Sequence, residues 1–554
     1  MPGGGFRSGG GDAEEVVKNR FLGFLLWQSV QSTLLYLLCK SLLLSPFSSR
    51  SFTTPSILAS LFAFITFHLS LLLFSFSLSS LASPHPHRPA SPLELAIALT
   101  RLVFVSGGPP PPPELRRRAR VSLSFVLFVT ASALSGCLCL VSVCWNSFAG
   151  SVGRKSNYWR LLGELGFRGL AVGFFYGLCY VCQRRWVLQF PIIQRPPFFS
   201  FKMGLPSATV QALKLSTAAY FFSTVLSLLL HHELMGQGTV GKVLAENIVF
   251  YVAIFVIFLC WELNHHLHQV LHTKRLIFAP AKGSAAAETN PSEPLLAALE
   301  ESTSRSLVQY LAYLDLCMVC ERNVDAWRRA AFFEETGETY KRVIAICLRP
   351  LEQFASKLGE GIESTSSGKS FQLDHQLQLP TDSRLISRHL ELFDDFQLCV
   401  WCARIVGSLT IRSHKEDRFG VAQLSGSNSA VISTLLSCLL AVETFMGKKN
   451  SSQSSLGSGG IKWTTAGTVR REAAVVGLAA GKRRGSPLYS KAYCMADILR
   501  TSIYQIVSAF HDEMLTNAKP GLLDKDWITS SKPVYGTREL LLYKLRLFLD
   551  FQAN

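Results

Sequence analysis

The chain has 554 residues, of which 48% are hydrophobic and 17% charged, and its mean hydropathy is +0.26. Soluble globular chains average about 25% charged residues, so this composition argues against a water-soluble globule and against an intrinsically disordered chain. The formal net charge is +17 at pH 7.

The charged residues are unevenly distributed along the chain. Residues 1–273 contain only nine acidic and 21 basic residues, whereas residues 274–554 contain 29 acidic and 34 basic ones. This division predicts a membrane half followed by a soluble half. Basic residues on the loops of a membrane half are explained by membrane topology and attraction to lipid headgroups better than by nucleic-acid binding.

Six segments of the first half are long and apolar enough to cross a bilayer, for which about 20 residues are needed. The first is expected to be a retained anchor, because its apolar run exceeds the apolar region of a signal peptide. A further segment, Leu93–Val105, has only 13 residues and carries Glu94 and Arg101, so we expect an in-plane helix. The predicted spans are Phe21–Leu44, Ile57–Ala82, Val121–Trp145, Leu161–Cys182, Val210–Leu230 and Leu244–Leu263.

The Lys and Arg residues of the connecting segments predict the orientation. With six spans the two termini share a side, and the segments on that side carry sixteen Lys and Arg residues against five on the other. Positive residues accumulate on the cytosolic side. Both termini are therefore predicted to face the cytosol or nucleoplasm, including an N-terminal segment of residues 1–20.

The fourth predicted span has a face of small residues, Gly169, Gly173 and Gly177, spaced four apart. Small residues let a second helix approach closely in lipid, so this face is predicted to pack against another helix, although membrane helices are also rich in glycine for no special reason. Glu164 and Arg168 lie one turn apart and can neutralise each other.

The second half is predicted to be all helical. A linker at 274–294 precedes a domain at 295–554, in which apolar residues repeat every three or four positions and strand-like alternation is scarce. We expect Pro350 to end a helix, and the polar segments 359–383 and 446–460 to be surface loops or disordered inserts. The predicted fold class is all-α, with six transmembrane helices and a cytosolic helical C-terminal domain.

Two groups of residues were candidates for chemistry. Membrane di-iron oxidoreductases gather histidines at the cytosolic ends of spans, and an enzyme of that kind, or a transporter, stays open as an alternative function. The competing interpretation places these histidines among lipid headgroups, because His231 and His232 fall on the opposite side of the membrane. The candidate iron ligands are His265, His266, His268 and His272.

Three Cys-x-x-Cys pairs have the spacing of zinc ligands, but each lies in an apolar, helical stretch and not on a turn. We expect buried free thiols. The sequence contains no phosphate-binding, metalloprotease or nucleophile-elbow motif. No catalytic residue, cofactor site or metal site is predicted, and the protein is not expected to be an enzyme. The pairs are Cys179/Cys182, Cys317/Cys320 and Cys399/Cys402.

The segment joining the fourth and fifth spans is apolar, aromatic and stiffened by proline, and it is suited to the headgroup region of a membrane. Its interface residues are predicted to be Phe190, Pro191, Arg195, Phe198, Phe199 and Lys202. Together with six spans and a helical tail, this segment and three tail motifs resemble the nuclear-division-cycle transmembrane nucleoporins. The motifs are Tyr310-Leu-Ala-Tyr-Leu-Asp315, Glu338-Thr-Tyr-Lys-Arg342 and Cys347-Leu-Arg-Pro-Leu351.

This resemblance implies a component of the nuclear pore's membrane ring, which anchors the pore scaffold in the nuclear envelope and supports pore assembly. Transport of protein and mRNA would depend on it indirectly. The implied partners are the bilayer of the pore membrane, other membrane-ring nucleoporins, aladin and the linker nucleoporins of the inner ring. Neither nucleic acid nor a small-molecule substrate is an expected ligand.

Overall fold

The computed structural model divides into two compact units. The N-terminal unit comprises Gly9–Arg275 with Arg305–Leu307, and the C-terminal unit comprises Leu276–Ser304 and Val308–Asn554. The elements of the described residues are helices, apart from a single bridge between Ser83 and Val187, which confirms the all-α class. The residues described are 10–43, 54–87, 89–90, 94, 96, 113–149, 155–191, 193–230, 240–280, 283–302, 305–367, 393–453, 487–516 and 527–553.

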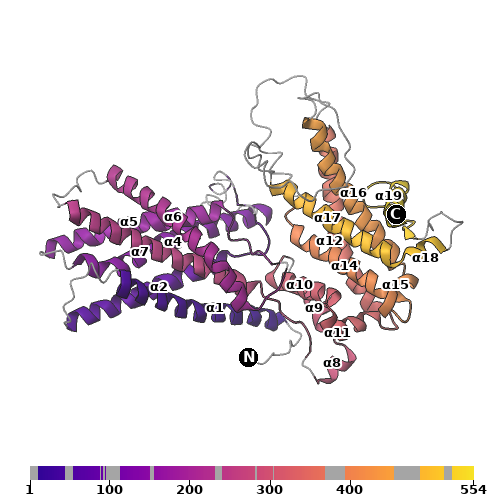
Figure 1. Ribbon diagram of the computed structural model, residues 1–554, viewed down its shortest axis with the longest axis horizontal. Helices are drawn as coiled ribbons and strands as arrows, with labels where there is room; N and C mark the ends of the chain where they lie inside the picture. The colour runs from indigo at the N-terminus through magenta and orange to yellow at the C-terminus, as the bar shows by residue number, and fades with distance from the viewer. Residues whose placement is uncertain are drawn as a thin grey trace, which may run out of the picture. The chain divides into compact units, whose positions relative to one another are not determined.

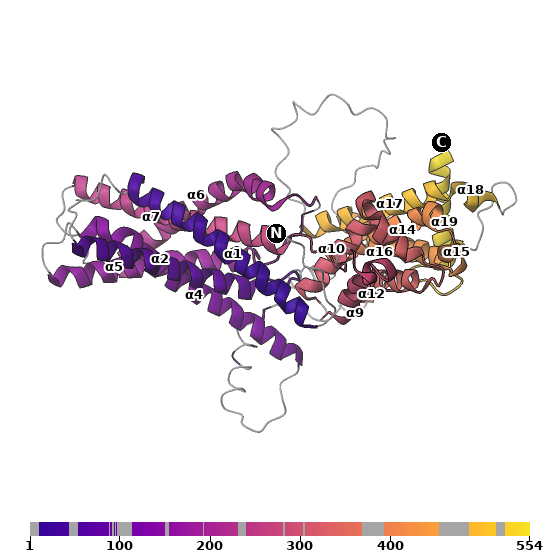
Figure 2. The same ribbon diagram turned by 90° about the horizontal axis from the view of Figure 1, so that it is seen from below.

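Long helices that run alongside one another build the N-terminal unit (Figure 1). The same arrangement is visible from below in Figure 2. Helix α4 packs between α2 and α5, while α7 packs against α1, α4 and α6. The elements are α1 (Gly10–Leu38), the π-helical turn η1 (Cys39–Leu43), α2 (Thr54–Leu81), α4 (Pro113–Ala149), α5 (Lys155–Cys182), α6 (Pro197–Leu230) and α7 (Val240–His272).

Apolar side chains cover the outside of these helices. Phe62 is 72% exposed and Leu229 is 75% exposed, which is the surface expected of helices solvated by lipid tails. All six are long and apolar enough to cross a membrane, and they overlap the six predicted spans. Of the predicted in-plane helix Leu93–Val105, only Glu94 and Ala96 lie within the described residues.

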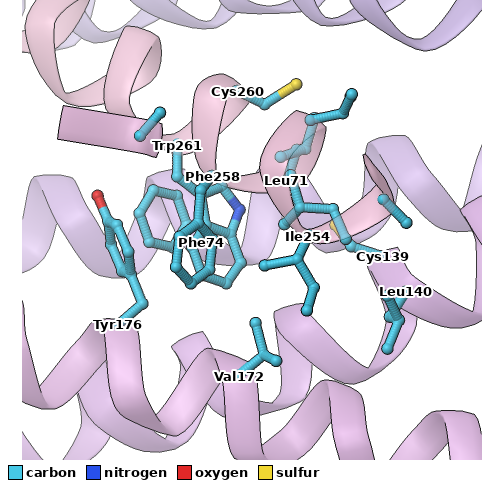
Figure 3. Packing of buried hydrophobic residues seen from close by; sticks show 14 of the residues in the cluster. Leu71, Phe74, Cys139, Leu140, Val172, Tyr176, Ile254, Phe258, Cys260 and Trp261 are labelled. Atoms are coloured by element: carbon cyan, nitrogen blue, oxygen red, sulfur yellow. The ribbon is translucent and has the colours of Figure 1, made fainter. Parts of the chain in front are cut away.

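Aromatic and aliphatic side chains together fill the interior of the N-terminal unit (Figure 3). The rings of Phe74 and Trp261 stack with centroids 4.7 Å apart, and Tyr176 meets Trp261 edge to face at 4.8 Å. Pairs of this kind contribute roughly 0.5–1.5 kcal/mol each beyond the area that they bury. The cluster joins α2, α5 and α7, which are far apart in the sequence.

The C-terminal unit packs its helices around a buried one. Its core is formed where α16 contacts α12, α14, α17 and α19. The elements are α8 (Ala285–Thr289), α9 (Glu293–Glu301), α10 (Leu307–Glu321), η3 (Asn323–Asp325), α11 (Ala326–Ala330), η4 (Ala331–Phe333), α12 (Glu338–Ser367), α14 (Phe396–Glu416), α15 (Val421–Leu424), α16 (Ser427–Gln453), α17 (Pro487–Ala509), α18 (His511–Thr516) and α19 (Arg538–Ala553).

Helix α16 is a seventh helix with the length and apolarity of a membrane span over Ser427–Gly447. Its surroundings differ from those of the other six. In its most apolar stretch 72% of the residues are buried, compared with 22–50% in the helices of the N-terminal unit. An apolar helix covered on all sides by its own protein has no face left for lipid, so we assign α16 to the core of the C-terminal unit.

The expectation that Pro350 ends a helix is wrong, because α12 runs through it to Ser367. Proline cannot donate to the carbonyl four residues earlier. That carbonyl belongs to Ile346 and instead accepts a hydrogen bond from the Tyr313 hydroxyl at 3.3 Å. A neighbouring helix thus satisfies the group that proline leaves unpaired.

Two predicted inserts begin later than expected. Helix α12 covers 359–367, and α16 covers 446–453, so these residues are helical and not loop. A polar helix end has the same composition as a loop, so sequence periodicity alone does not distinguish the two. The remainders, 368–383 and 454–460, lie outside the described residues.

The segment predicted as a linker also contains structure. It holds α8, and Phe278 is completely buried within the C-terminal unit. The backbone N–H of Phe278 donates to the Asp315 carboxylate at 3.0 Å. Part of the 274–294 segment is therefore packed, because the Phe278 side chain is buried and its backbone N–H is paired.

Candidate functional site in the N-terminal unit

A buried carboxylate lies near the end of α7. Glu262 is 2% exposed and receives two hydrogen bonds from the Arg185 guanidinium, at 2.7 and 2.5 Å, and one from the Tyr176 hydroxyl at 3.0 Å. A charge in an apolar interior is tolerated only when it is paired in this way. Burial lowers the pKa of Arg185, but the Glu262 carboxylate outweighs that effect and raises the pKa above its ordinary value.

The turn after α5 brings Arg185 to this position. Arg184 adopts a left-handed conformation, with φ of 54°, which turns the chain sharply after Cys182. The Tyr180 hydroxyl donates to the Arg185 carbonyl at 3.2 Å, and Ser83 exchanges backbone hydrogen bonds with Trp186 and Leu188 at 3.2 and 2.9 Å. The end of α2 and the end of α5 therefore hold the turn together.

A cavity of about 870 Å³ opens beside this ion pair. The α5–α6 connection, the first turns of α6 and the last turns of α7 form its walls. Three cations line it, namely Arg185, Arg195 and Lys274. Most of the other polar lining residues are uncharged, and the glutamines among them are Gln183, Gln189, Gln194, Gln211 and Gln269.

Two of these glutamines hold the walls in place. Gln269 accepts from the backbone N–H of Gln189 at 3.1 Å and donates to the Val187 carbonyl at 3.3 Å. Gln194 accepts from the backbone N–H of Arg275 at 3.3 Å and donates to the Thr273 carbonyl at 3.4 Å. These hydrogen bonds hold the α5–α6 connection against the end of α7, so the walls of the cavity are fixed relative to each other.

Arg20, near the start of α1, caps the end of α7. Its guanidinium donates to the carbonyls of Leu271, His272 and Lys274 at 3.1, 2.7 and 2.7 Å. These carbonyls lack partners within the helix, and the C-terminal end of a helix carries partial negative charge. The contact places the beginning of α1 and the end of α7 at the same end of the N-terminal unit.

The four candidate iron ligands are not brought together. His265 bonds the Tyr180 hydroxyl at 3.0 Å, while the His266 ring lies within 3.3 Å of the carbonyls of Ser200 and Phe201. His268 and His272 stack on each other with centroids 3.9 Å apart. Among the described residues, no three His, Cys, Asp or Glu side chains are grouped as ligands of one ion, and the di-iron alternative has no structural support.

The placement of these histidines among lipid headgroups is also wrong for His268 and His272. Their side chains are 2% and 3% exposed, and Phe24 of α1 packs edge-on against both rings. They are buried because α1 crosses the end of α7 at this point. A sequence offers no sign of which face of one helix another helix will cover.

The predicted interface residues divide between two environments. Phe190 is 7% exposed and packs inside the unit, whereas Pro191 and Arg195 are exposed. Phe198 and Phe199, at 71% and 56%, and Lys202 are exposed on the first turns of α6. These three belong to a helix and not to a loop, since Pro197 has the fixed φ that suits the first position of a helix.

The glycine face of α5 lies directly against α4. A methyl group added at Gly173 would meet the backbone oxygen of Ser132 and would lie 2.8 Å from the Ala133 Cα atom. At Gly169 it would lie 2.7 Å from the Cys137 Cα atom. Gly177 has slightly more room, with the Val129 Cα atom at 3.1 Å. The two backbones are in contact along this face, which only glycine permits.

The cysteine pairs are free thiols, as the structure describes them. Cys317, Cys320, Cys399 and Cys402 are buried in the C-terminal unit. Cys182 is exposed at the end of α5, so the expectation of burial is wrong for this residue. Cys182 is the last residue of α5, where neighbouring helices no longer cover the side chain.

Sequence reasoning missed the pairing of Glu262 with Arg185. A signal was present, because Glu262 is one of only two charged residues in its predicted span, the other being Glu246 at the opposite end, and an ionisable residue inside a span marks a functional or structural site. Its partner lies 77 positions earlier in the chain. Nothing in the spacing of the two residues indicates that they meet.

The tail motif at Tyr310–Asp315 has a structural role. Asp315 is fully buried and is paired with Arg328, whose side chain is also buried, at 2.8 Å. Arg328 further donates to the Phe278 carbonyl at 2.8 Å. Tyr310 is 1% exposed and packs edge-on against Trp401. The motif thus joins α10 to α11, to α14 and to the segment that precedes α8.

These features define a helical protein with a membrane-spanning unit and a second, helical unit built on a buried apolar helix. The family model described as nucleoporin protein Ndc1-Nup matches residues 381–515, within the C-terminal unit. The match confirms the resemblance predicted from the sequence: over these residues the chain is similar to the Ndc1-Nup nucleoporins. Proteins of this kind are located in the nuclear envelope at the nuclear pore, with membrane and pore partners. No curated protein matches the chain.

Proposed function

We propose that the chain anchors the nuclear pore scaffold in the membrane and supports pore assembly, with transport of protein and mRNA depending on it indirectly. The match to the nucleoporin family in the C-terminal unit is the observation that carries this proposal. The apolar outer faces of the helices in the N-terminal unit support a membrane anchor. A scaffold role requires no catalytic residue.

The test is the location and the rescue activity of a tagged full chain. In cells depleted of the endogenous protein, we expect the tagged chain to form a punctate nuclear rim that coincides with pores and to restore pore density. A variant with Asp315→Leu, which leaves Arg328 buried without its carboxylate, should reach the membrane but fail to restore pore density. A reticular or plasma-membrane pattern for the parent chain would reject the proposal.

We further propose that both termini lie on the cytosolic or pore side. The sixteen-to-five distribution of Lys and Arg supports this orientation. The Arg20 contact with the end of α7 supports an even number of crossings, because it joins the two ends of the N-terminal unit. Protease added to sealed microsomes should remove the C-terminal unit and leave the N-terminal unit partly protected; a protected C-terminal unit would reverse the orientation.

The partners follow from the resemblance alone. We propose that the chain contacts other membrane-ring nucleoporins, aladin and the linker nucleoporins of the inner ring. Crosslinking of the full chain in isolated nuclear envelopes, followed by mass spectrometry, should identify these proteins on the C-terminal unit. Crosslinks confined to proteins outside the pore would contradict the assignment.

A further inference from the structure

The cavity beside the Arg185–Glu262 pair has an excess of positive charge. Arg185 and Glu262 neutralise each other through their two hydrogen bonds. Arg195 and Lys274 remain, and neither has an ion-pair partner within the described residues. Both are exposed at the mouth of the cavity, where the nearest interaction of the Arg195 guanidinium is with the Met203 sulfur. Two unpaired cations at one opening favour an anionic ligand.

Other lining residues offer amide groups instead of charges. Gln183, Gln189 and Gln211 line the cavity, and their side-chain amides have no partner among the described residues. Each amide carries both donors and an acceptor, and a hydroxyl group likewise donates and accepts. Three such amides around one space suit a ligand that carries several hydroxyl groups.

The cavity also adjoins the surface that faces lipid. Its lining on α6 extends from Pro197 to Gln211, which is about 21 Å along the helix axis at 1.5 Å per residue. Over the same stretch α6 exposes Phe199 and Val210, at 56% and 51%, and neither residue lines the cavity. A molecule in this cavity therefore has polar protein on one side and the apolar phase beside it.

We propose that this cavity binds a phosphorylated polyol, supplied as the headgroup of an anionic phospholipid such as phosphatidylinositol. Arg195 and Lys274 pair with the phosphate, and Gln183, Gln189 and Gln211 bond the ring hydroxyls. The volume of about 870 Å³ lies within the range of roughly 300–1,000 Å³ that is usual for ligand sites. The adjoining apolar face of α6 favours a lipid over a soluble inositol phosphate.

The test measures lipid retained by the full chain in nanodiscs, by native mass spectrometry after release from the discs. Phosphatidylinositol and phosphatidylglycerol carry the same charge and differ in their hydroxyl groups, so they are offered in equal amounts. We expect the parent chain to retain phosphatidylinositol preferentially. The variant Arg195→Gln/Lys274→Gln should retain about tenfold less of it, as loss of two charge-assisted contacts predicts.

A matched control separates the cavity from general attraction to anionic lipid. Arg184→Gln/Lys202→Gln removes the same charge from exposed residues of the same connection and helix, neither of which lines the cavity. This variant should retain phosphatidylinositol like the parent chain. If both double variants lose it equally, the attraction is not specific to the cavity and the proposal fails.

The glutamines are tested through selectivity. Gln183→Leu/Gln211→Leu should abolish the preference for phosphatidylinositol over phosphatidylglycerol, while the cations still hold either lipid. A parent chain that shows no preference between the two lipids would overturn the proposal. Thermal unfolding of each variant shows whether the unit is intact. If a double variant is unfolded, the charge test is repeated with the single variant Arg195→Gln, because Arg195 is exposed and its replacement should not disturb the fold.

A soluble competitor distinguishes the two sources of the ligand. Glycerophosphoinositol carries the same headgroup without acyl chains, and we expect it to displace the lipid only at large excess. If it binds as tightly as the lipid and loses binding in the same variants, the site is supported and its ligand is a soluble phosphorylated polyol. If no cavity variant changes either glycerophosphoinositol binding or the amount of phosphatidylinositol retained, the ligand does not occupy this cavity and the proposal is overturned.

Discussion

The two units are both built from helices, but one has apolar residues on its surface and a charged pair in its interior, and the other has the reverse arrangement. In the N-terminal unit the outward residues are apolar, as at Phe62 and Leu229, and the buried pair of Arg185 and Glu262 lies inside. In the C-terminal unit the apolar helix α16 is inside, and outward residues form ion pairs such as Arg342 with Glu300 at 2.8 Å.

This difference shows which forces hold each unit together. Water drives apolar side chains into the core of the C-terminal unit. Lipid tails supply no such force between helices. The N-terminal unit relies instead on close backbone contact at Gly173, on stacked rings such as Phe74 and Trp261, and on buried polar pairs. Specific polar and small residues should therefore matter more there than bulky apolar ones.

The largest effect is expected from Glu262→Leu. Removing one partner of a buried ion pair leaves the other charge uncompensated, which costs about 3–5 kcal/mol, and Tyr176 also loses its acceptor. Thermal unfolding of the detergent-solubilised chain measures this loss. The double variant Arg185→Leu/Glu262→Leu removes both charges and should recover most of the stability. If the double variant is as unstable as the single one, the cost does not come from an unpaired charge.

Gly173→Leu tests the backbone contact between α5 and α4. The added side chain has no space beside Ser132 and Ala133, and overpacking of a core typically costs about 1–3 kcal/mol. The unit should unfold at a clearly lower temperature while insertion into the membrane is unchanged. Gly163→Leu is the matched control on the same helix, because a side chain there meets nothing within 4 Å. Equal behaviour of the two variants would contradict close packing along this face.

A smaller effect is expected from Tyr313→Phe in the C-terminal unit. The change removes the hydrogen bond to the Ile346 carbonyl, which should cost about 1 kcal/mol. In a Pro350→Ala background the new N–H at position 350 can bond that carbonyl within the helix, so Tyr313→Phe should then cost less. A double-mutant cycle from chemical denaturation measures the coupling, and a coupling of zero would mean that Tyr313 does not compensate for the proline.

The smallest change concerns thiol reactivity and leaves stability unaltered. Burial raises the pKa of the Cys317 and Cys399 thiols, which lowers the fraction of reactive thiolate at neutral pH. Cys494 is exposed on α17. Iodoacetamide should therefore modify Cys494 well before Cys317 and Cys399 in the native chain, as measured by peptide mass spectrometry. Rapid modification of Cys399 in the native chain would show that α14 opens easily.

Sequence reasoning located parts of the candidate site but not its arrangement. Arg195 and Lys202 were both assigned to a membrane-facing segment, yet only Arg195 lines the cavity. The histidines were grouped because 265, 268 and 272 share a helical face. In the structure their rings have different neighbours, because Tyr180 bonds His265 whereas Phe24 packs against His268 and His272. Partners supplied by distant helices carry no signature in local spacing.

The sequence by itself determined the helical class, the apolar spans and the resemblance to the nucleoporin family, because hydrophobic length and helical periodicity are local properties of the chain. It also determined that α5 presents a glycine face. Tertiary structure alone decided that α4 covers this face, that α16 is an interior helix and that Pro350 is accommodated within α12. Each of these depends on which helices become neighbours, and that choice is made by the packing of the whole unit.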